Sequence, residues 1–245
     1  MVAVGLIFIL KMSNNEKQKS TTNIAGVVSV DPIEHASMIL GWNGKTIYTD
    51  PVGGVSMFVG KPDTDIILLT DIHGDHLDIE RLKALAQEKA IIVAPKAVAD
   101  KVPEDLKSKI FMMNNGEVAE QMGFEIEAIP MYNLPESDQS FHTKSRGNGY
   151  VISQGGMRVY ISGDTSGIPE MRNLRDIDMA FVAMNLPYTM SVEEAADAVL
   201  AFKPLRVYPY HYRTPEGFSD VAKFKELVNK ANPAIEVVQL EWYPK

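Results

Sequence analysis

The 245-residue chain contains no cysteine and only five histidines. Without cysteine, disulfide bonds, thiolate metal sites and thiol nucleophiles are excluded. No G-x-S-x-G motif stands at a strand-to-helix turn, which leaves a serine-nucleophile hydrolase without support. The glycine-rich stretches lack the G-x-x-x-x-G-K-[ST] spacing of a phosphate-binding loop. Histidines and carboxylates are left as the candidate chemical groups.

Basic residues are also in deficit. The chain has 24 lysines and arginines against 32 aspartates and glutamates, a net charge of −8 and a pI near 5.2. This balance argues against a nucleic-acid backbone as the main partner, because no basic face is expected to dominate the surface. We expect a small-molecule substrate instead. The sequence leaves homo-oligomer formation open.

No apolar run is long enough to span a bilayer. The longest, from Val2 to Leu10, has nine residues, which predicts no stable membrane insertion. It would suit the core of a secretory signal, but a basic n-region and a small-residue cleavage site are missing. Residues 1–22 are therefore either a degraded export signal or a disordered tail, and the location is exported or cytoplasmic accordingly. Residues 23–245 are predicted to form the folded domain.

Short apolar runs separated by turn signals dominate this domain. Strands are expected at 24–30, 37–42, 45–50, 65–70, 90–95, 124–130, 149–154, 157–164, 179–184, 206–210 and 235–240. WNGK at 42–45 and QGGM at 154–157 are two-residue hairpin signals. The first half therefore favours antiparallel strands.

Three helices are expected. Asp78 caps the first, at 79–89. Ser191 and Glu194 form a capping box before AADAVLAF, a helix that ends at Pro204. The third covers 218–231, with apolar residues at helical spacing. The whole predicts one α/β domain with much antiparallel sheet and with helices outside.

The stretch TDIHGDHLD, residues 70–78, holds two of the five histidines beside three aspartates. It follows the apolar run IILL, so it is a loop whose base is fixed by a buried strand. Imidazole and carboxylate together form the ligand set for Zn²⁺, Mn²⁺ or Fe²⁺. Alternate residues of an extended segment point the same way, so Asp71, His73 and Asp75 can converge, while His76 points elsewhere and suits a second ion. For Asp78 alone, helix capping is the better reading.

Three more polar residues stand at strand ends or in a loop before a strand. Asp164 follows RVYISG, His211 follows RVYPY, and His142 precedes GYVIS. The ordered series D-x-H-x-D-H, His, Gly-Asp-Thr and a late His resembles the metallo-β-lactamase superfamily. HASMILGWNGKTIYTDPVGG at the front is similar to the branch of metal-dependent hydrolases that includes ascorbate-6-phosphate lactonase and N-acyl-phosphatidylethanolamine phospholipase D. The resemblance covers residues 24–245.

This resemblance implies a four-layer αββα sandwich with two divalent metal ions, zinc or manganese with iron as an alternative, at one edge of its sheets. Asp71, His73 and His142 would hold the first metal. Asp75, His76 and His211 would hold the second, and Asp164 would bridge. The implied activity is hydrolysis of an ester, lactone or phosphodiester by a metal-bound hydroxide. Asp75, Asp164 and Tyr188 would be the catalytic residues, with Asp75 orienting the nucleophile or moving its proton.

Other residues are candidates for substrate binding, namely His35, Asn133, Lys144 and Arg146. Each has a plainer interpretation: a hydrogen-bonded structural histidine for His35, and a solvated loop for Lys144 and Arg146. Tyr188 is a candidate donor to a substrate oxygen, although an aromatic residue beside a strand is more often part of the core.

Asp71 departs from the family pattern, which most often begins with histidine. A carboxylate there would tilt the site towards Mn²⁺ or Fe²⁺, or else it orients a ligand without touching the metal. Two other functions stay open. One is a non-catalytic metal- or ligand-binding module on the same fold, although every other ligand position is filled. The other is a di-iron redox protein, which His73 and the missing flavin domain disfavour.

Overall fold

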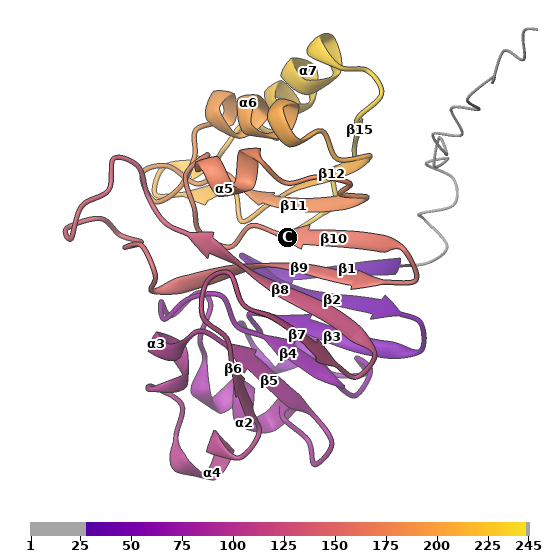
Figure 1. The fold of residues 1–245 in the computed structure, drawn as a ribbon, viewed down its shortest axis with the longest axis vertical. Helices are drawn as coiled ribbons and strands as arrows, with labels where there is room; N and C mark the ends of the chain where they lie inside the picture. The colour runs from indigo at the N-terminus through magenta and orange to yellow at the C-terminus, as the bar shows by residue number, and fades with distance from the viewer. Residues whose placement is uncertain (1–27, 244–245) are drawn as a thin grey trace, which may run out of the picture.

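The computed structural model describes residues 28–243 and contains two large β-sheets that pack face to face (Figure 1). The first sheet has the strand order β1 (Val28–Glu34), β2 (Ser37–Trp42), β3 (Lys45–Thr49), β4 (Ile66–Leu68), β5 (Ile91–Ala94) and β6 (Ile110–Met112). The second has the order β15 (Glu236–Val237), β12 (Arg206–Tyr210), β11 (Met179–Ala183), β10 (Met157–Ile161), β9 (Gly147–Gln154), β8 (Phe124–Met131) and β7 (Val118–Gln121). A short hairpin, β13 (Arg213–Thr214) with β14 (Gly217–Phe218), lies apart from both.

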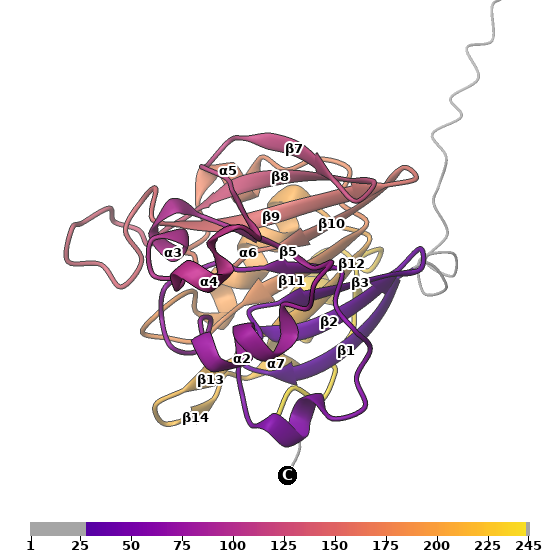
Figure 2. The same cartoon turned by 90° about the horizontal axis from the view of Figure 1, so that it is seen from below.

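Helices cover the outer face of each sheet. The first sheet carries α2 (Ile79–Leu85), α3 (Lys96–Ala99) and α4 (Glu104–Lys107), which Figure 2 shows lying across its strands; the 3-10 helix η1 (Val55–Phe58) lies nearby. The second sheet carries α5 (Pro169–Arg172), α6 (Val192–Phe202) and α7 (Val221–Ala231). Three clusters of buried apolar residues fill the spaces between these layers. The predicted four-layer αββα sandwich is therefore confirmed.

Both predicted hairpins form with the expected register. Trp42 pairs with Lys45 and Gln154 pairs with Met157. The two residues of each turn have positive φ, the conformation that asparagine and glycine tolerate best.

The prediction of antiparallel pairing throughout the first half is wrong. Within the first sheet only β1, β2 and β3 pair antiparallel, whereas β3 to β6 are parallel. The apolar runs IILL and IIVA are buried on both faces, as is typical of parallel strands, and α2 is the crossover between β4 and β5.

The three predicted helices exist, but two have different ends. Helix α2 ends at Leu85 because Ala86 leaves helical geometry, and Lys109 donates to the carbonyls of Gln87 and Glu88. Helix α7 begins at Val221 because Phe218 belongs to β14 and Asp220 is the cap.

The expected capping box before α6 forms only in part. The Ser191 hydroxyl accepts from the Glu194 amide, as predicted, but the Glu194 carboxylate accepts from the amide of Gly167. This contact ties α6 to the segment that follows β10. Helix α6 then ends at Phe202, with Lys203 as its C-cap directly before Pro204, as expected.

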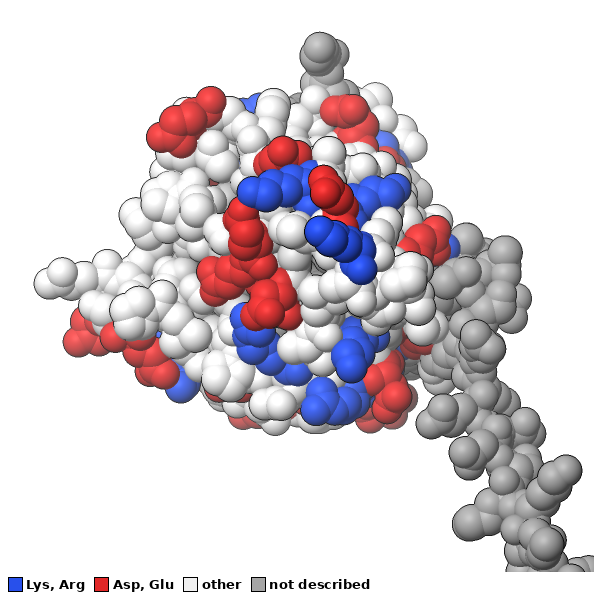
Figure 3. Space-filling model, turned by 90° about the horizontal axis from the view of Figure 1, so that it is seen from above, with Lys and Arg blue, Asp and Glu red and all other residues white. Residues whose placement is uncertain are grey.

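Strands β6, β7, β13 and β14 and helices α3, α4 and α5 were not expected from the sequence. The predicted tail, residues 1–22, and the start of the strand expected at 24–30 lie outside the described residues. Within residues 28–243, no helix has the length and apolar character needed to cross a bilayer. Acidic and basic side chains intermingle on the face over α6 and α7 (Figure 3), as in the ion pair of Lys223 with Glu193.

Gly149 in β9 lies against the chain that leaves β10. A Cβ atom at this position would lie 2.8 Å from the carbonyl oxygen of Ile161 and 2.7 Å from that of Ser162. We expect Gly149→Ala to lower the free energy of unfolding by about 1–3 kcal/mol, because backbone atoms must move to admit the methyl group. Gly54→Ala is the control, since its nearest neighbour would be 3.7 Å away. Equal denaturation midpoints for the two variants would contradict this expectation.

Candidate metal centre

Four segments meet at one edge of the sandwich, at the left of Figure 1 where the loop between β8 and β9 projects. The loop after β4 carries Asp71 to His76, the β8–β9 loop carries His142, and the ends of β10 and β12 supply Asp164 and His211. The amide of Asn148 in β9 donates to the carbonyl of Thr70, which joins the first two segments. The seven predicted ligands are brought together from distant parts of the chain, namely Asp71, His73, Asp75, His76, His142, Asp164 and His211.

The first group of potential ligands consists of Asp71, His73 and His142, as predicted. Oδ2 of Asp71 lies 2.6 Å from Nδ1 of His73 and 3.7 Å from Nε2 of His142. Asn133 orients His142: its Oδ1 accepts from the His142 amide at 2.8 Å, and its Nδ2 donates to the carbonyl of Tyr188. Asn133, predicted as a substrate contact, thus buttresses a candidate ligand.

The second group consists of His76, Asp164 and His211. Nε2 of His76 lies 3.2 Å from Nε2 of His211 and 3.3 Å from Oδ2 of Asp164. The same Oδ2 lies 3.3 Å from Nε2 of His142, so the Asp164 carboxylate reaches both groups. Asp75 stands beside the second group, with Oδ2 3.3 Å from Nε2 of His211 and with a partly exposed side chain.

Buried carboxylates and imidazoles in this site shift one another's pKa values. Burial opposes ionisation of Asp164, but His211 and His76 hold the pKa of its carboxyl well below the usual range. Burial likewise opposes a charge on His76, yet the Asp164 and Asp50 carboxylates raise its pKa well above the usual value. Burial also opposes the ionisation of Asp71, whose pKa is lowered by the hydrogen bond from His73. The carboxylates favour a positive charge at the centre of the site.

Asp50, at the end of β3, was missed by the sequence analysis. Its side chain is fully buried, and it accepts from the Thr70 amide at 2.7 Å, the Thr70 hydroxyl at 2.5 Å and Nδ1 of His76 at 2.9 Å. Metal-binding histidines commonly donate their second ring N–H to such a carboxylate, which fixes the ring and its tautomer. The signal in the sequence was the aspartate of KTIYTDP directly after a strand, the same pattern that drew attention to Asp164.

Lys144 and Arg146, the two basic candidates for substrate binding, each pair with a carboxylate of this chain. The guanidinium of Arg146 lies on Asp71, with Nε and one terminal nitrogen each 3.2 Å from a carboxylate oxygen. The ammonium of Lys144 lies 2.9 Å from Glu136 and over the ring of Tyr132. A substrate contact for either residue stays a prediction, whereas the neutralisation of Asp71 by Arg146 is part of the structure.

A cavity of about 290 Å³ opens over the two groups. Its lining consists of His73, Asp75, Phe141, His142, Asp164 and Tyr188. The Tyr188 ring packs edge-on against Phe141 with centroids 4.9 Å apart. Tyr188 therefore lies where a substrate would enter.

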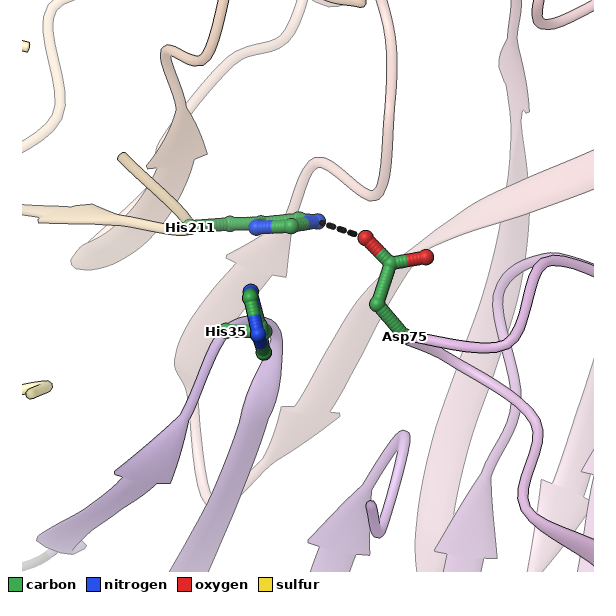
Figure 4. Close-up of side chains that lie close together, drawn as sticks. All are labelled: His35, Asp75 and His211. Atoms are coloured by element: carbon green, nitrogen blue, oxygen red, sulfur yellow. Dashed lines mark ion pairs between the residues drawn. The ribbon is translucent and has the colours of Figure 1, made fainter. Parts of the chain in front are cut away.

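His35, at the turn between β1 and β2, lies beside the ring of His211 (Figure 4). One of its ring nitrogens is within 4.8 Å of potential ligand atoms of both Asp75 and His211. Its ring centroid is 5.5 Å from that of His211, and the rings are nearly perpendicular. His35 does not line the cavity over the metal groups.

The donor set suits divalent cations. Nε2 of His142 and Oδ1 of Asp164 are buried and make no hydrogen bond of normal geometry within the described residues, although both face the other potential ligands. Buried polar atoms usually have a partner, so such atoms indicate a group that binds between them. Histidine and carboxylate ligands with an accessible cavity are the arrangement of a catalytic metal site.

Comparison with known proteins agrees with this geometry. The profile of the β-lactamase superfamily domain matches residues 29–211. The chain belongs to the metallo-β-lactamase superfamily. It is 32% identical over 212 residues to the UPF0173 metal-dependent hydrolase of Thermococcus onnurineus, a match that covers 82% of this chain and 92% of the relative.

Solved structures extend the similarity. A metal-dependent hydrolase from Parabacteroides distasonis has a TM-score of 0.79 and 35% identity, covering 88% of this chain and 94% of that one. The metallo-β-lactamase fold protein YhfI from Bacillus subtilis has a TM-score of 0.67 at 14% identity, which concerns the fold alone; the match covers 86% of this chain and 95% of that one. The chain is thus a member of a superfamily of metal-dependent hydrolases, the class predicted from its sequence. The branch of ascorbate-6-phosphate lactonase stays a prediction.

Proposed function

We propose that this chain hydrolyses an ester, lactone or phosphodiester bond with two divalent ions, zinc or manganese with iron as an alternative. The observation that carries the proposal is the Asp164 carboxylate, whose Oδ2 lies 3.3 Å from a histidine nitrogen of each ligand group. Two ligand groups that share one carboxylate are what a binuclear centre requires.

The proposed ligands divide into two sets. Asp71, His73 and His142 would hold the first ion; Asp75, His76 and His211 would hold the second; Asp164 would lie between them. Arg146 and Asp50 support these sets from behind, because they fix Asp71 and His76. Their contacts reduce the freedom of the ligands and so favour metal binding.

When bound, the divalent ions would lower the pKa of water towards neutrality and polarise the bond under attack. The chain's own side chains would manage the proton and the substrate. The partly exposed Asp75 carboxylate is placed to accept a proton from the attacking water. The Tyr188 hydroxyl would donate to the substrate oxygen on which charge develops.

The proposal is tested by turnover after the protein has been stripped of metal and reconstituted separately with Zn²⁺, Mn²⁺ and Fe²⁺. Each form is assayed with p-nitrophenyl butyrate, a γ-lactone and bis-p-nitrophenyl phosphate. We expect metal-dependent hydrolysis of at least one compound and its loss in Asp75→Asn. Metal-loaded protein that hydrolyses none of the three, with Asp75→Asn indistinguishable from it, would contradict the proposal.

Tyr188→Phe provides a sharper test of the site. The substitution keeps the ring that packs against Phe141 and removes only the hydroxyl, so we expect kcat to fall by about 10²-fold with unchanged metal content. Tyr212→Phe is the matched control, because Tyr212 does not line the cavity. An unchanged kcat for Tyr188→Phe would remove Tyr188 from the catalytic residues.

A further inference from the structure

The cavity over the proposed metal centre has an apolar entrance. Phe141 and Tyr188 line it, and the Phe141 side chain is 50% exposed. Large apolar side chains that gather at the mouth of a site and stay exposed usually bind something apolar.

The charges around this entrance favour the same conclusion. No lysine or arginine lines the cavity as far as residues 28–243 are concerned. The two nearby cations, Lys144 and Arg146, are held by Glu136 and Asp71. An anionic group on the substrate, outside the reacting bond, would find no free cation there, whereas an uncharged chain or ring would cover exposed apolar surface.

We infer that the substrate carries an uncharged aliphatic or aromatic group beside its scissile bond, and that Phe141 and Tyr188 bind that group. This inference rests on the proposed function for the position of the reacting bond. It narrows the substrate to apolar esters, lactones or comparable neutral compounds, and away from sugar phosphates.

Hydroxamates test the inference by binding alone, because they bind divalent metal and are not turned over. We expect calorimetry on the zinc-loaded protein to give octanohydroxamate at least about tenfold higher affinity than acetohydroxamate, since each buried methylene contributes favourably. Replacing the terminal methyl with a carboxylate should cancel that gain. Phe141→Ser should remove most of it. Phe111→Ser, which changes an exposed phenylalanine on β6, should leave it intact.

Equal affinities for the two hydroxamates, or no binding of either, would overturn the inference. So would an affinity gain from the terminal carboxylate. A chain-length effect without hydrolysis of the ester, the lactone or the phosphodiester would support the apolar subsite while contradicting the proposed activity, so the two failures are distinguishable.

Discussion

Replacing His211 with alanine is expected to leave about one divalent ion per chain where the native protein binds two. Nε2 of His211 lies within 3.5 Å of His76, Asp75 and Asp164, so its removal opens one side of the second ligand set. Loss of one ligand should weaken the binding of that ion by roughly a hundredfold or more, because only a few ligands share the free energy of metal binding. Elemental analysis after reconstitution and desalting gives the stoichiometry.

His142→Ala is the companion variant, since it removes a ligand from the first set only. We expect it to lose the other ion, so the two variants should each retain one equivalent and the double variant none. Tyr188→Phe should retain both. Native stoichiometry in both His211→Ala and His142→Ala would exclude the ligand assignment.

Asp50→Asn should be the most damaging substitution outside the ligands. The buried Asp50 carboxylate accepts from Thr70 twice and from His76, and an amide in its place brings a donor against those donors. We expect metal affinity to fall by about 10–100-fold and the metal-free protein to lose about 3 kcal/mol of stability, because a buried charge loses its partner. Chelator competition and chemical denaturation measure the two effects.

Asp65→Asn is the matched control for this variant. Asp65 precedes β4, accepts from the amide of Thr46 and from Lys45, and is partly exposed. Its loss should cost only about 1 kcal/mol and leave metal affinity unchanged. If Asp50→Asn and Asp65→Asn behaved alike, Asp50 would have no special role in holding His76.

The layered fold was predictable because its strands are short apolar runs with clear turns. Asn43 and Gly44 favour the φ values of their hairpin, and Ser191 caps α6 as its hydroxyl predicts. The parallel pairing of β3 to β6 was harder to predict from the sequence, since register between distant strands depends on tertiary contacts. Short elements such as α3 and α4, four residues each, carry too little periodicity to be recognised.

The candidate ligands were predictable because each stands at a strand end or in a loop, in a chain with few histidines. The residues that hold these ligands in place were harder to predict. Asp50 and Arg146 act through contacts across 26 and 75 residues of sequence, and no local pattern encodes such pairs. Arg146 in particular was a candidate for substrate binding or a residue of a solvated loop, and neither interpretation included the match of its fork geometry to the carboxylate of Asp71.

Metal content of the native protein, purified without added metal or chelator, tests the central claim most directly. Elemental analysis against a protein concentration from amino-acid analysis gives both the element and the ratio. We predict close to two equivalents of zinc, manganese or iron per chain. A chain that holds no metal, even after reconstitution with each of the three, would contradict the binuclear centre and the hydrolysis proposed from it.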